Sequence, residues 1–233
     1  MPKVLTLTAT PGEMKGLKAS LTGLKPKNFI HELVETGPGK LNSALCLSKL
    51  LVESPVDLIL GAGTAGSLEL SLKAGDFLVS DEVVIGDWRM EDGASAQVAP
   101  YGSFDYGAIE ERLERLVIHC DHPLTQKLIG RLGPEFLRGR ILSSDTFVAG
   151  RSHKLNLGKL FGCRICEMEA GAIAHVARRS GNPAWLHLRV VADTLDDALD
   201  DYFHMEVDMA KILGERVAEV LAILDKEWSS LQG

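Results

Sequence analysis

Short apolar segments alternate with amphipathic helical segments along the chain, and this alternation limits the fold more than any other feature. Residues 3–10 are typical of a strand, and residues 11–24 follow with apolar side chains at helical spacing. The same order recurs up to a last helix at residues 206–228, whose apolar stripe runs from Ala210 to Trp228. The pattern predicts an α/β fold in which helices flank a central, mostly parallel or mixed β-sheet.

The remaining elements are expected to follow one another through short connections. Strands are expected at residues 28–37, 56–63, 139–150, 164–170 and 184–194, and residues 75–88 are expected to form one strand or two strands separated by a kink. Helices are expected at residues 39–54, 122–138, 151–162 and 171–181. The helix at 39–54 has one apolar face, made of Leu41, Ala44, Leu45 and Val52. Ligands of such sheets bind where the strands end, so we expect the functional site at the carboxyl ends of the strands.

Composition limits the class of ligand. The 233 residues include 45% hydrophobic and 24% charged side chains, enough for a single domain, residues 1–233, with a buried core. The net charge is −7, and no basic stripe is interleaved with aromatic residues, which argues against binding to nucleic acid. No apolar run approaches the ~20 residues of a membrane span, and no signal segment is seen at the N-terminus. We expect a cytoplasmic protein that binds a small molecule, with a mobile loop at residues 89–107.

Two local patterns invite other interpretations. Cys163 and Cys166 form a CxxC, but on a strand residues three apart face opposite sides, so reduced, buried cysteines are expected and no metal site. Gly61, Gly63 and Gly66 match the GxGxxG of dinucleotide-binding proteins, but no helix of sufficient length follows them. The glycines are expected to let the backbone turn tightly or approach a ligand closely.

Carboxyl side chains are the strongest candidates for chemistry. Glu167 and Glu169 flank Met168 in an otherwise small and apolar stretch, where at least one carboxylate needs a polar ligand. Asp193 ends an apolar strand at the expected ligand edge, where burial should raise the pKa of its carboxyl. Glu13, taken alone, is more typical of an acid in the first turn of a helix.

Taken in order, these residues resemble the nucleoside phosphorylase and nucleosidase superfamily, most closely the bacterial 5′-methylthioadenosine/S-adenosylhomocysteine nucleosidases. The resemblance covers most of the chain, and its specific parts are "SSDTFVAG" at residues 143–150 and "EMEAGAIAHVA" at residues 167–177. It implies an N-glycosyl hydrolase with no metal or cofactor. It also implies a homodimer in which the neighbouring subunit closes the pocket for the 5′ substituent.

The resemblance assigns roles to the ribose and purine contacts. Glu169 is similar to the glutamate that accepts hydrogen bonds from the ribose hydroxyls, and Met168 to the methionine against the sugar. Glu167 matches a supporting position. Phe147 looks like the aromatic that stacks on the purine, and the backbone of Val148 like the group that reads the base edge.

The same resemblance assigns the catalytic groups. Asp193 matches the acid at purine N7, protonated through burial, and Glu13 the carboxylate that orients the attacking water. Phe203 corresponds to an aromatic near the 5′ substituent. The substrate-binding glycine segment is Gly63, Thr64 and Ala65. Asp196 and Asp197 are expected to be ordinary turn residues.

Departures from the family pattern leave alternatives open. Residues 8–16 and 60–67 lack the arginines with which phosphorylases hold phosphate, which favours hydrolysis. Ala192 stands where nucleosidases usually have a serine, Thr10 where they often have an apolar residue, and residues 88–106 align poorly. A futalosine-type hydrolase and a purine nucleoside phosphorylase remain alternatives within the superfamily. A non-catalytic nucleoside-binding protein and an NAD-dependent oxidoreductase are the alternatives outside it.

Overall fold

The structure, a computed structural model, describes residues 1–91, 96–98, 107–195 and 199–232. Its central sheet consists of β1 (Lys3–Thr8), β2 (Ile30–Glu35), β3 (Leu58–Ser67), β4 (Phe77–Ser80), β5 (Glu82–Ile85), β9 (Ile118–His119), β10 (Phe136–Arg138), β11 (Ile141–Ser143), β12 (Ile165–Glu167) and β13 (Ala184–Asp193). The order is β10-β4-β13-β3-β12-β11-β5-β9, with β1 also paired to β3 and β2 paired to β1. Parallel and antiparallel pairs both occur, so the predicted mixed sheet is confirmed.

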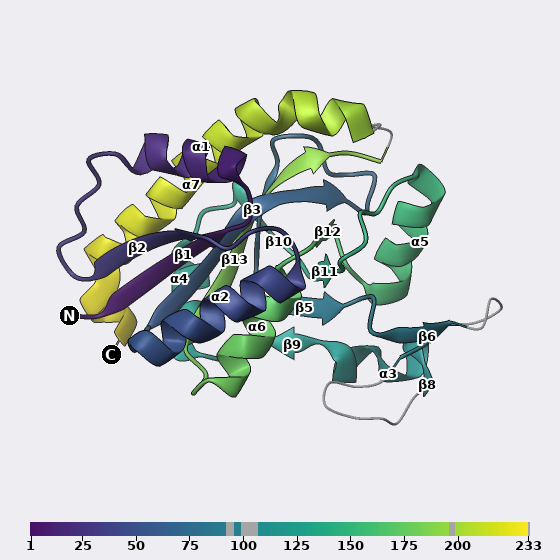
Figure 1. Cartoon of the computed structure of the whole chain (residues 1–233), viewed down its shortest axis with the longest axis horizontal. Helices are drawn as coiled ribbons and strands as arrows, with labels where there is room; N and C mark the ends of the chain where they lie inside the picture. The colour runs from purple at the N-terminus through teal and green to yellow at the C-terminus, as the bar shows by residue number, and fades with distance from the viewer. Residues whose placement is uncertain (92–95, 99–106, 196–198, 233) are drawn as a thin grey trace.

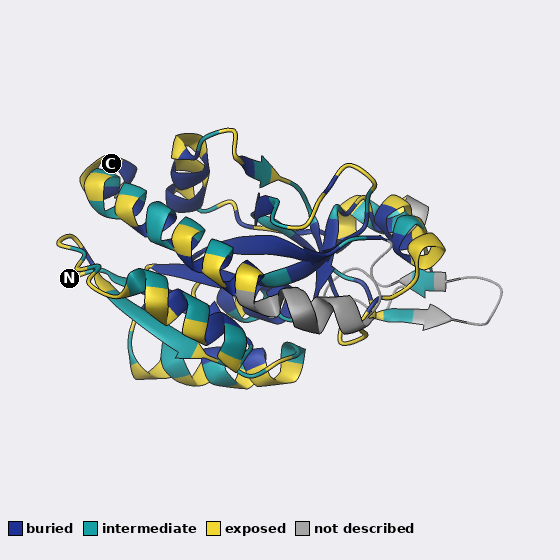
Figure 2. Cartoon of the chain, turned by 90° about the horizontal axis from the view of Figure 1, so that it is seen from above, coloured by how far each residue is buried: buried dark blue, intermediate teal, exposed yellow. Residues whose placement is uncertain are grey.

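Helices cover both faces of this sheet, as expected (Figure 1). They are α1 (Pro11–Leu21), α2 (Lys40–Glu53), α3 (Ile109–Leu116), α4 (Pro123–Arg131), α5 (Arg151–Phe161), α6 (Ala170–Arg179) and α7 (Leu199–Gln232). Helices α1, α4 and α7 share one apolar core with the sheet, and α2 and α6 share another. Figure 2 shows the buried strands between helices whose outer faces are exposed. A small second sheet contains β6 (Arg89–Glu91), β7 (Ala96–Val98) and β8 (Gly107–Ala108).

Strand β3 organises the middle of the sheet. Its first half pairs with β1, its last residues pair with β12, and β13 runs parallel to it along nearly its whole length. A register shift near the end of β13 places Asp193 opposite Gly66. The glycines of the GxGxxG pattern therefore lie inside a strand, and no helix begins directly behind them. This excludes the dinucleotide-binding interpretation, which needs a glycine loop that opens a helix.

Several predicted elements differ from the structure. The helix expected at 122–138 ends at Arg131, and its last three residues instead form strand β10 at the edge of the sheet. Gly133 and Pro134 lie between the two elements, and proline lacks the N–H that a helix interior needs. Of the two possibilities for residues 75–88, one strand or two, the structure has two, β4 and β5. Residues 89–107, expected to form a mobile loop, lie largely outside the described part of the chain.

The apolar face of α2 does not point to the core, in contrast to the usual behaviour of an amphipathic helix. Leu41, Leu45 and Val52 are 71%, 64% and 88% exposed, while Ser43 and Leu47 are buried. The two buried residues turn toward the sheet, where Leu47 belongs to the core shared with α6. The sequence pattern thus identified an apolar stripe correctly but did not show what covers it.

The cysteines are free, as predicted, and Cys163 and Cys166 are buried. Burial raises the pKa of the Cys166 thiol to about 12, so the thiol is neutral. Among the described residues, no group of His, Cys, Asp and Glu side chains is arranged to hold a metal ion. Within the same residues, no helix combines the length and the apolar character that a membrane crossing requires.

Candidate active site

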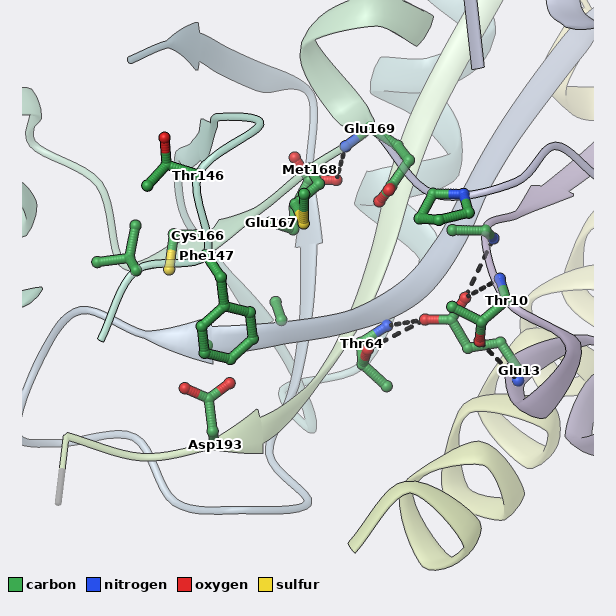
Figure 3. A pocket seen from close by; sticks show the side chains of 15 residues that line it. Thr10, Glu13, Thr64, Thr146, Phe147, Cys166, Glu167, Met168, Glu169 and Asp193 are labelled. Atoms are coloured by element: carbon green, nitrogen blue, oxygen red, sulfur yellow. Dashed lines mark hydrogen bonds between the residues drawn. The ribbon is translucent and has the colours of Figure 1, made fainter. Parts of the chain in front are cut away.

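A pocket of about 350 Å³ opens at the carboxyl ends of several strands, where the sequence analysis placed the site (Figure 3). Most of the predicted site residues line it: Glu13, Thr64, Ala65, Phe147, Val148, Glu167, Met168, Glu169 and Asp193. The pocket is also lined by Thr10 and by residues that were not predicted as substrate contacts: Ala9, Pro38, Gly66, Thr146 and Cys166. Phe203 lies in α7, but its side chain is outside the part that the structure describes.

Local sequence explains the position of Glu13. Thr10 caps the N-terminus of α1, and Pro11 occupies the first helical position. The backbone N–H of Glu13 donates to Oγ1 of Thr10 at 3.2 Å, and the backbone N–H of Thr10 donates to Oε2 of Glu13 at 3.1 Å. This reciprocal capping box satisfies two helix-end donors and fixes the glutamate against β1. The interpretation of Glu13 as a first-turn acid is correct, but the same side chain also reaches the pocket.

The carboxylate of Glu13 accepts hydrogen bonds from five donors. Oε1 accepts from the backbone N–H of Thr64 at 2.7 Å and from its hydroxyl at 3.0 Å. Oε2 accepts from the Thr8 hydroxyl and from the backbone N–H groups of Ala9 and Thr10. A side chain on Gly63 would place its Cβ 2.9 Å from Oε1, so the close approach of β3 requires glycine there. Gly63 therefore serves the site by making room for Glu13, whereas Thr64 and Ala65 line the pocket.

The two neighbouring carboxylates, Glu167 and Glu169, have different partners. Oε2 of Glu167 accepts from Arg189 at 2.5 Å and from the backbone N–H groups of Glu169 and Ala170. Arg189 is fully enclosed and also donates to the carbonyl of Gly61 at 2.6 Å. Glu167 therefore anchors the start of α6 to β13, which is a supporting role.

Glu169 is directed to the pocket and accepts one hydrogen bond from the backbone N–H of Gly39, at 2.7 Å from Oε1. Burial, together with the nearby charge of Glu167, raises the pKa of Glu169 to about 8, against the opposing effect of Arg189. A carboxyl whose pKa is raised in this way is largely protonated at neutral pH. It becomes charged more easily when hydroxyl groups of a ligand donate hydrogen bonds to it. This property suits a group that binds the hydroxyls of a sugar.

Asp193 is 5% exposed, at the end of β13, and it faces the pocket. Its Oδ2 contacts Nζ of Lys154, which is 1% exposed and also donates to the carbonyl of Thr194 at 2.6 Å. An adjacent ammonium favours the charged form of a carboxylate, in opposition to burial. The predicted protonation of Asp193 by burial therefore stays a prediction, with Lys154 acting against it.

Lys154 was missed in the sequence analysis, although a signal existed. The buried face of α5 consists of Lys154, Leu157, Gly158 and Phe161. A lysine that shares helical spacing with apolar residues is buried only when a charged partner meets it. That spacing, combined with Asp193 at a strand end, could have suggested the pair.

Figure 3 shows how the groups are distributed around the pocket. Asp193 and Phe147 lie on one side, and Glu13 with Thr64 on the other. Glu169 and Met168 project from the segment after β12. Phe147 is 43% exposed, which leaves an aromatic face available to a flat ligand, while Val148 beside it is buried. The pocket therefore offers an aromatic surface near one acid and a second acid across the cavity.

Residues 5–224 match the family described as the Phosphorylase superfamily. The chain belongs to this superfamily. Its match covers most of the chain and confirms the resemblance drawn from residues 143–150 and 167–177. A 5′-methylthioadenosine/S-adenosylhomocysteine nucleosidase from Staphylococcus aureus (strain bovine RF122 / ET3-1) is 27% identical over 81% of this chain and 79% of its own.

Solved structures from the superfamily have the same fold. The Helicobacter pylori 5′-methylthioadenosine/S-adenosyl homocysteine nucleosidase, in complex with a substituted pyrrolidin-3-ol, has a TM-score of 0.78 at 22% identity over 96% of this chain and 99% of its own. The futalosine hydrolase of the same organism has a TM-score of 0.74 at 21% identity over 95% of this chain and 97% of its own. The fold of this superfamily member is thus shared by enzymes of two different names.

Charge distinguishes the pocket of this superfamily member from a phosphate site. Its described lining includes Glu13, Glu167, Glu169 and Asp193, and among these lining residues there is no arginine or lysine. The nearest buried cations are directed at carboxylates, Arg189 at Glu167 and Lys154 at Asp193. A phosphate ion would meet negative charge here without a dedicated cation.

Proposed function

We propose that this protein is a nucleosidase that hydrolyses the N-glycosidic bond of 5′-thio-substituted adenosines, such as methylthioadenosine and S-adenosylhomocysteine, and releases adenine. The observation that carries the proposal is the placement of Glu13 and Asp193 on opposite sides of one pocket, with Glu169 directed into it. A binding protein would need the aromatic and the sugar contacts but not two opposed acids. The family and the named relatives support the same reaction.

The reaction needs an acid for the leaving base. When the bond between the sugar and purine N9 breaks, its electron pair goes to the purine, and protonation at N7 neutralises the charge that develops there. Asp193 lies beside Phe147, the proposed stacking surface for the base, so it is the group placed to give that proton. Asp193 acts as the general acid.

The sugar side needs a nucleophile and negative charge. Departure of the base leaves the anomeric carbon electron-poor, and a carboxylate nearby both stabilises that charge and accepts a proton from the attacking water. Glu13 stands across the pocket from Asp193 and is held by five donors. Its position is therefore fixed before substrate arrives, so little reorganisation is needed in the transition state.

Glu169 orients the ribose between these two groups. A carboxylate that accepts from two vicinal hydroxyls makes charge-assisted hydrogen bonds and fixes the ring in one orientation. Met168 lines the pocket next to it and provides an apolar contact for the sugar. Restricting the sugar in this way raises the rate because the anomeric carbon is held between the acid and the water.

The decisive experiment is a substrate panel. Methylthioadenosine, S-adenosylhomocysteine, inosine and aminofutalosine are each incubated with the protein, with and without phosphate, and the released base is measured. Release of adenine from the two 5′-thio nucleosides without phosphate supports the proposal. Release that requires phosphate identifies a phosphorylase, and no base release from any of the four contradicts a nucleoside-cleaving activity.

A futalosine-type hydrolase is the second candidate. It is favoured by one observation, the hydroxyl side chain of Thr10 in the pocket lining. Thr10 lines the pocket at a position where an apolar residue suits a methylthio group, and a hydroxyl there suits a more polar 5′ substituent. Preferential cleavage of aminofutalosine in the panel would select this candidate.

The exposed stripe of α2 suggests a second copy of this chain as its partner. Leu41, Leu45 and Val52 form an apolar surface of the kind that marks protein contacts. The adjoining hollow is lined by Trp88, which directly precedes β6, and by Asp145, next to a residue that lines the active-site pocket. A homodimer formed through α2 therefore brings the neighbouring subunit to the edge of the pocket.

Light scattering tests the dimer. Leu45→Glu should convert a dimer into a monomer, while Glu53→Lys, a charge change at the end of the same helix, should leave the mass unchanged. A wild-type mass that equals one chain at every concentration contradicts the dimer.

We also propose the cytoplasm as the compartment of this protein, because free cysteines such as the four in this chain suit a reducing environment.

A further inference from the structure

The buried contact between Lys154 and Asp193 is not explained by the proposed roles of the pocket residues. Lys154 comes from α5, is 1% exposed, and contacts the carboxylate that serves as the acid. Removing an ammonium from water is costly even when it is paired. The ammonium is also placed where it opposes the protonated form of Asp193 that a general acid needs.

We propose that Lys154 is the proton reservoir of the acid, a positioning residue that holds Asp193 and passes to it the proton that Asp193 gives to the purine. The inference rests on the proposed nucleosidase function. In the resting protein the pair is an ammonium beside a carboxylate, and the pair as a whole has one proton to give. The same proton count describes a neutral amine beside a protonated carboxyl, so the two groups share one proton.

The proton balance of a turnover closes within this scheme. Lys154 passes its proton to Asp193 and becomes a neutral amine. The bond between the anomeric carbon and N9 breaks, its electron pair moves into the purine, and N7 takes this same proton from Asp193, which is again a carboxylate. Water adds its oxygen to the anomeric carbon and loses its proton to Glu13. When the products leave, solvent carries that proton away and another returns to Lys154, so the sum is nucleoside plus water to adenine plus free sugar.

Among the residues that the structure describes, the other charged groups around the pair leave its balance intact. On β12, the Cys166 thiol interacts with both members of the pair and is neutral because burial raises its pKa to about 12. Glu167, also on β12, is neutralised by Arg189 of β13. From β3, Gly66 packs against the carboxylate of Asp193 and brings no charge. The side chains of the first turns of α7, residues 199–207, lie outside the described part.

If the Lys154–Asp193 pair had only a structural role, different results would be expected. Two variants distinguish a structural role from a proton supply. Lys154→Met removes the cation and the reservoir, so Asp193 acts as a lone buried carboxyl that has a proton only toward acidic pH. Lys154→Arg keeps the cation, but a guanidinium does not give up its proton at any accessible pH. Arginine should therefore rescue a structural role and fail to rescue a proton supply.

The experiment measures the rate of methylthioadenosine cleavage from pH 5 to pH 9 for the wild type and both variants. We expect a flat wild-type profile through neutrality. The Lys154→Met rate should fall as pH rises and be about 10²-fold below the wild type at pH 8, within the range of general acid catalysis. Lys154→Arg should be slow at every pH by a similar factor.

A second substrate shows whether the loss concerns the leaving group alone. A 4-nitrophenyl riboside with a 5′-thiomethyl group has a leaving group that departs without protonation, so Lys154→Met should cleave it at nearly the wild-type rate. Equal losses on both substrates indicate general damage to the site and overturn the inference. A full rate for Lys154→Arg, or a wild-type pH profile for Lys154→Met, overturns it as well.

Two controls keep the result interpretable. If neither variant folds, the wild type still provides a test. Adenine release needs the proton of the Lys154–Asp193 pair, so its rate should fall at alkaline pH, whereas the rate of nitrophenol release should not. The absence of that difference counts against the reservoir. Failure of the proposed function appears separately, as a wild type that releases no adenine from any nucleoside.

Discussion

The two ends of the pocket bury their acids in opposite ways. Glu13 is 3% exposed and Asp193 is 5% exposed, so burial does not distinguish them. Glu13 is held by neutral donors from the backbone and from two threonines, whereas Asp193 contacts a buried ammonium. Neutral donors fix a carboxylate in place, but a titratable partner can also exchange a proton with it. The first end suits a water-orienting acceptor and the second a proton donor.

Replacing the acid should have the largest effect. Asp193→Asn keeps the size of the side chain but cannot give a proton, so we expect the rate on methylthioadenosine to fall by ~10²–10⁴. Binding of a transition-state-like inhibitor should persist, because Phe147 and Glu169 are untouched. Asp196→Asn, in a residue outside the described part, should leave the rate nearly unchanged.

The same variant leaves Lys154 without its counter-ion, and calorimetry can measure the resulting loss of stability. Breaking a buried pair costs about 3–5 kcal/mol, whereas replacing both partners is often neutral. The double variant Asp193→Asn with Lys154→Met should therefore recover stability without recovering the rate. Normal turnover of either variant would show that the acid is misassigned.

Replacing Glu13 tests the opposite end and should damage both rate and stability. In Glu13→Gln one oxygen becomes an NH₂ group, so a donor such as Thr64 N–H loses its acceptor, at a cost of about 1–3 kcal/mol. We expect a rate loss of about 10²-fold, at the lower end for acid–base groups, together with a lower Tm. Glu53→Gln, at the exposed end of α2, is the matched control. A Glu13→Gln protein with the wild-type Tm would show that the donors do not depend on the carboxylate.

The residues at the two ends of the pocket could be predicted from the sequence to different extents, for a physical reason. Glu13, Glu169 and Asp193 follow strands or begin helices, and strand ends of an α/β sheet meet at one edge, so local pattern and resemblance located them together. Lys154 reaches the site from the first turn of α5, and only the three-dimensional fold brings it to Asp193 at the end of β13.

Two features of the fold were not predicted, for related reasons. Periodicity marked one face of α2 as apolar but could not tell a core-facing stripe from an exposed one. Strand β10 was read as helix because three residues after Gly133 and Pro134 are too few to show a period. The central strands were predicted well, since long apolar runs such as β13 leave little choice.

A smaller effect is expected at Glu169, which lies between the two acids. Glu169→Gln replaces a charge-assisted acceptor by a neutral amide, and the loss of about 1.5–3 kcal/mol corresponds to roughly 10- to 100-fold in kcat/KM on the ribonucleoside. The loss should be much smaller on the 2′-deoxy substrate, which offers one hydroxyl fewer. Equal losses on both substrates would remove the assigned sugar contact.

The smallest effect is a pH dependence of stability. The folded pKa of Glu169 is raised to about 8 from an ordinary value of 4.5. The unfolded chain therefore releases this proton first as pH rises, and the contribution of Glu169 to stability declines between about pH 4.5 and 8 and is constant outside that window. We expect the Tm of Glu169→Gln, measured relative to wild type, to increase by a few degrees from pH 5 to pH 8. A difference that stays constant with pH would mean that Glu169 titrates normally.

The phosphate dependence of adenine release tests the central claim most directly. The protein, exhaustively freed of phosphate, is given methylthioadenosine, and adenine and the sugar product are quantified as phosphate is added. The account predicts that adenine and free 5-methylthioribose appear in equal amounts at a rate that phosphate does not change, because the described pocket lining has carboxylates and no cation to hold the ion. Adenine release that occurs only with phosphate and yields the sugar 1-phosphate, or no adenine release at all, would contradict it.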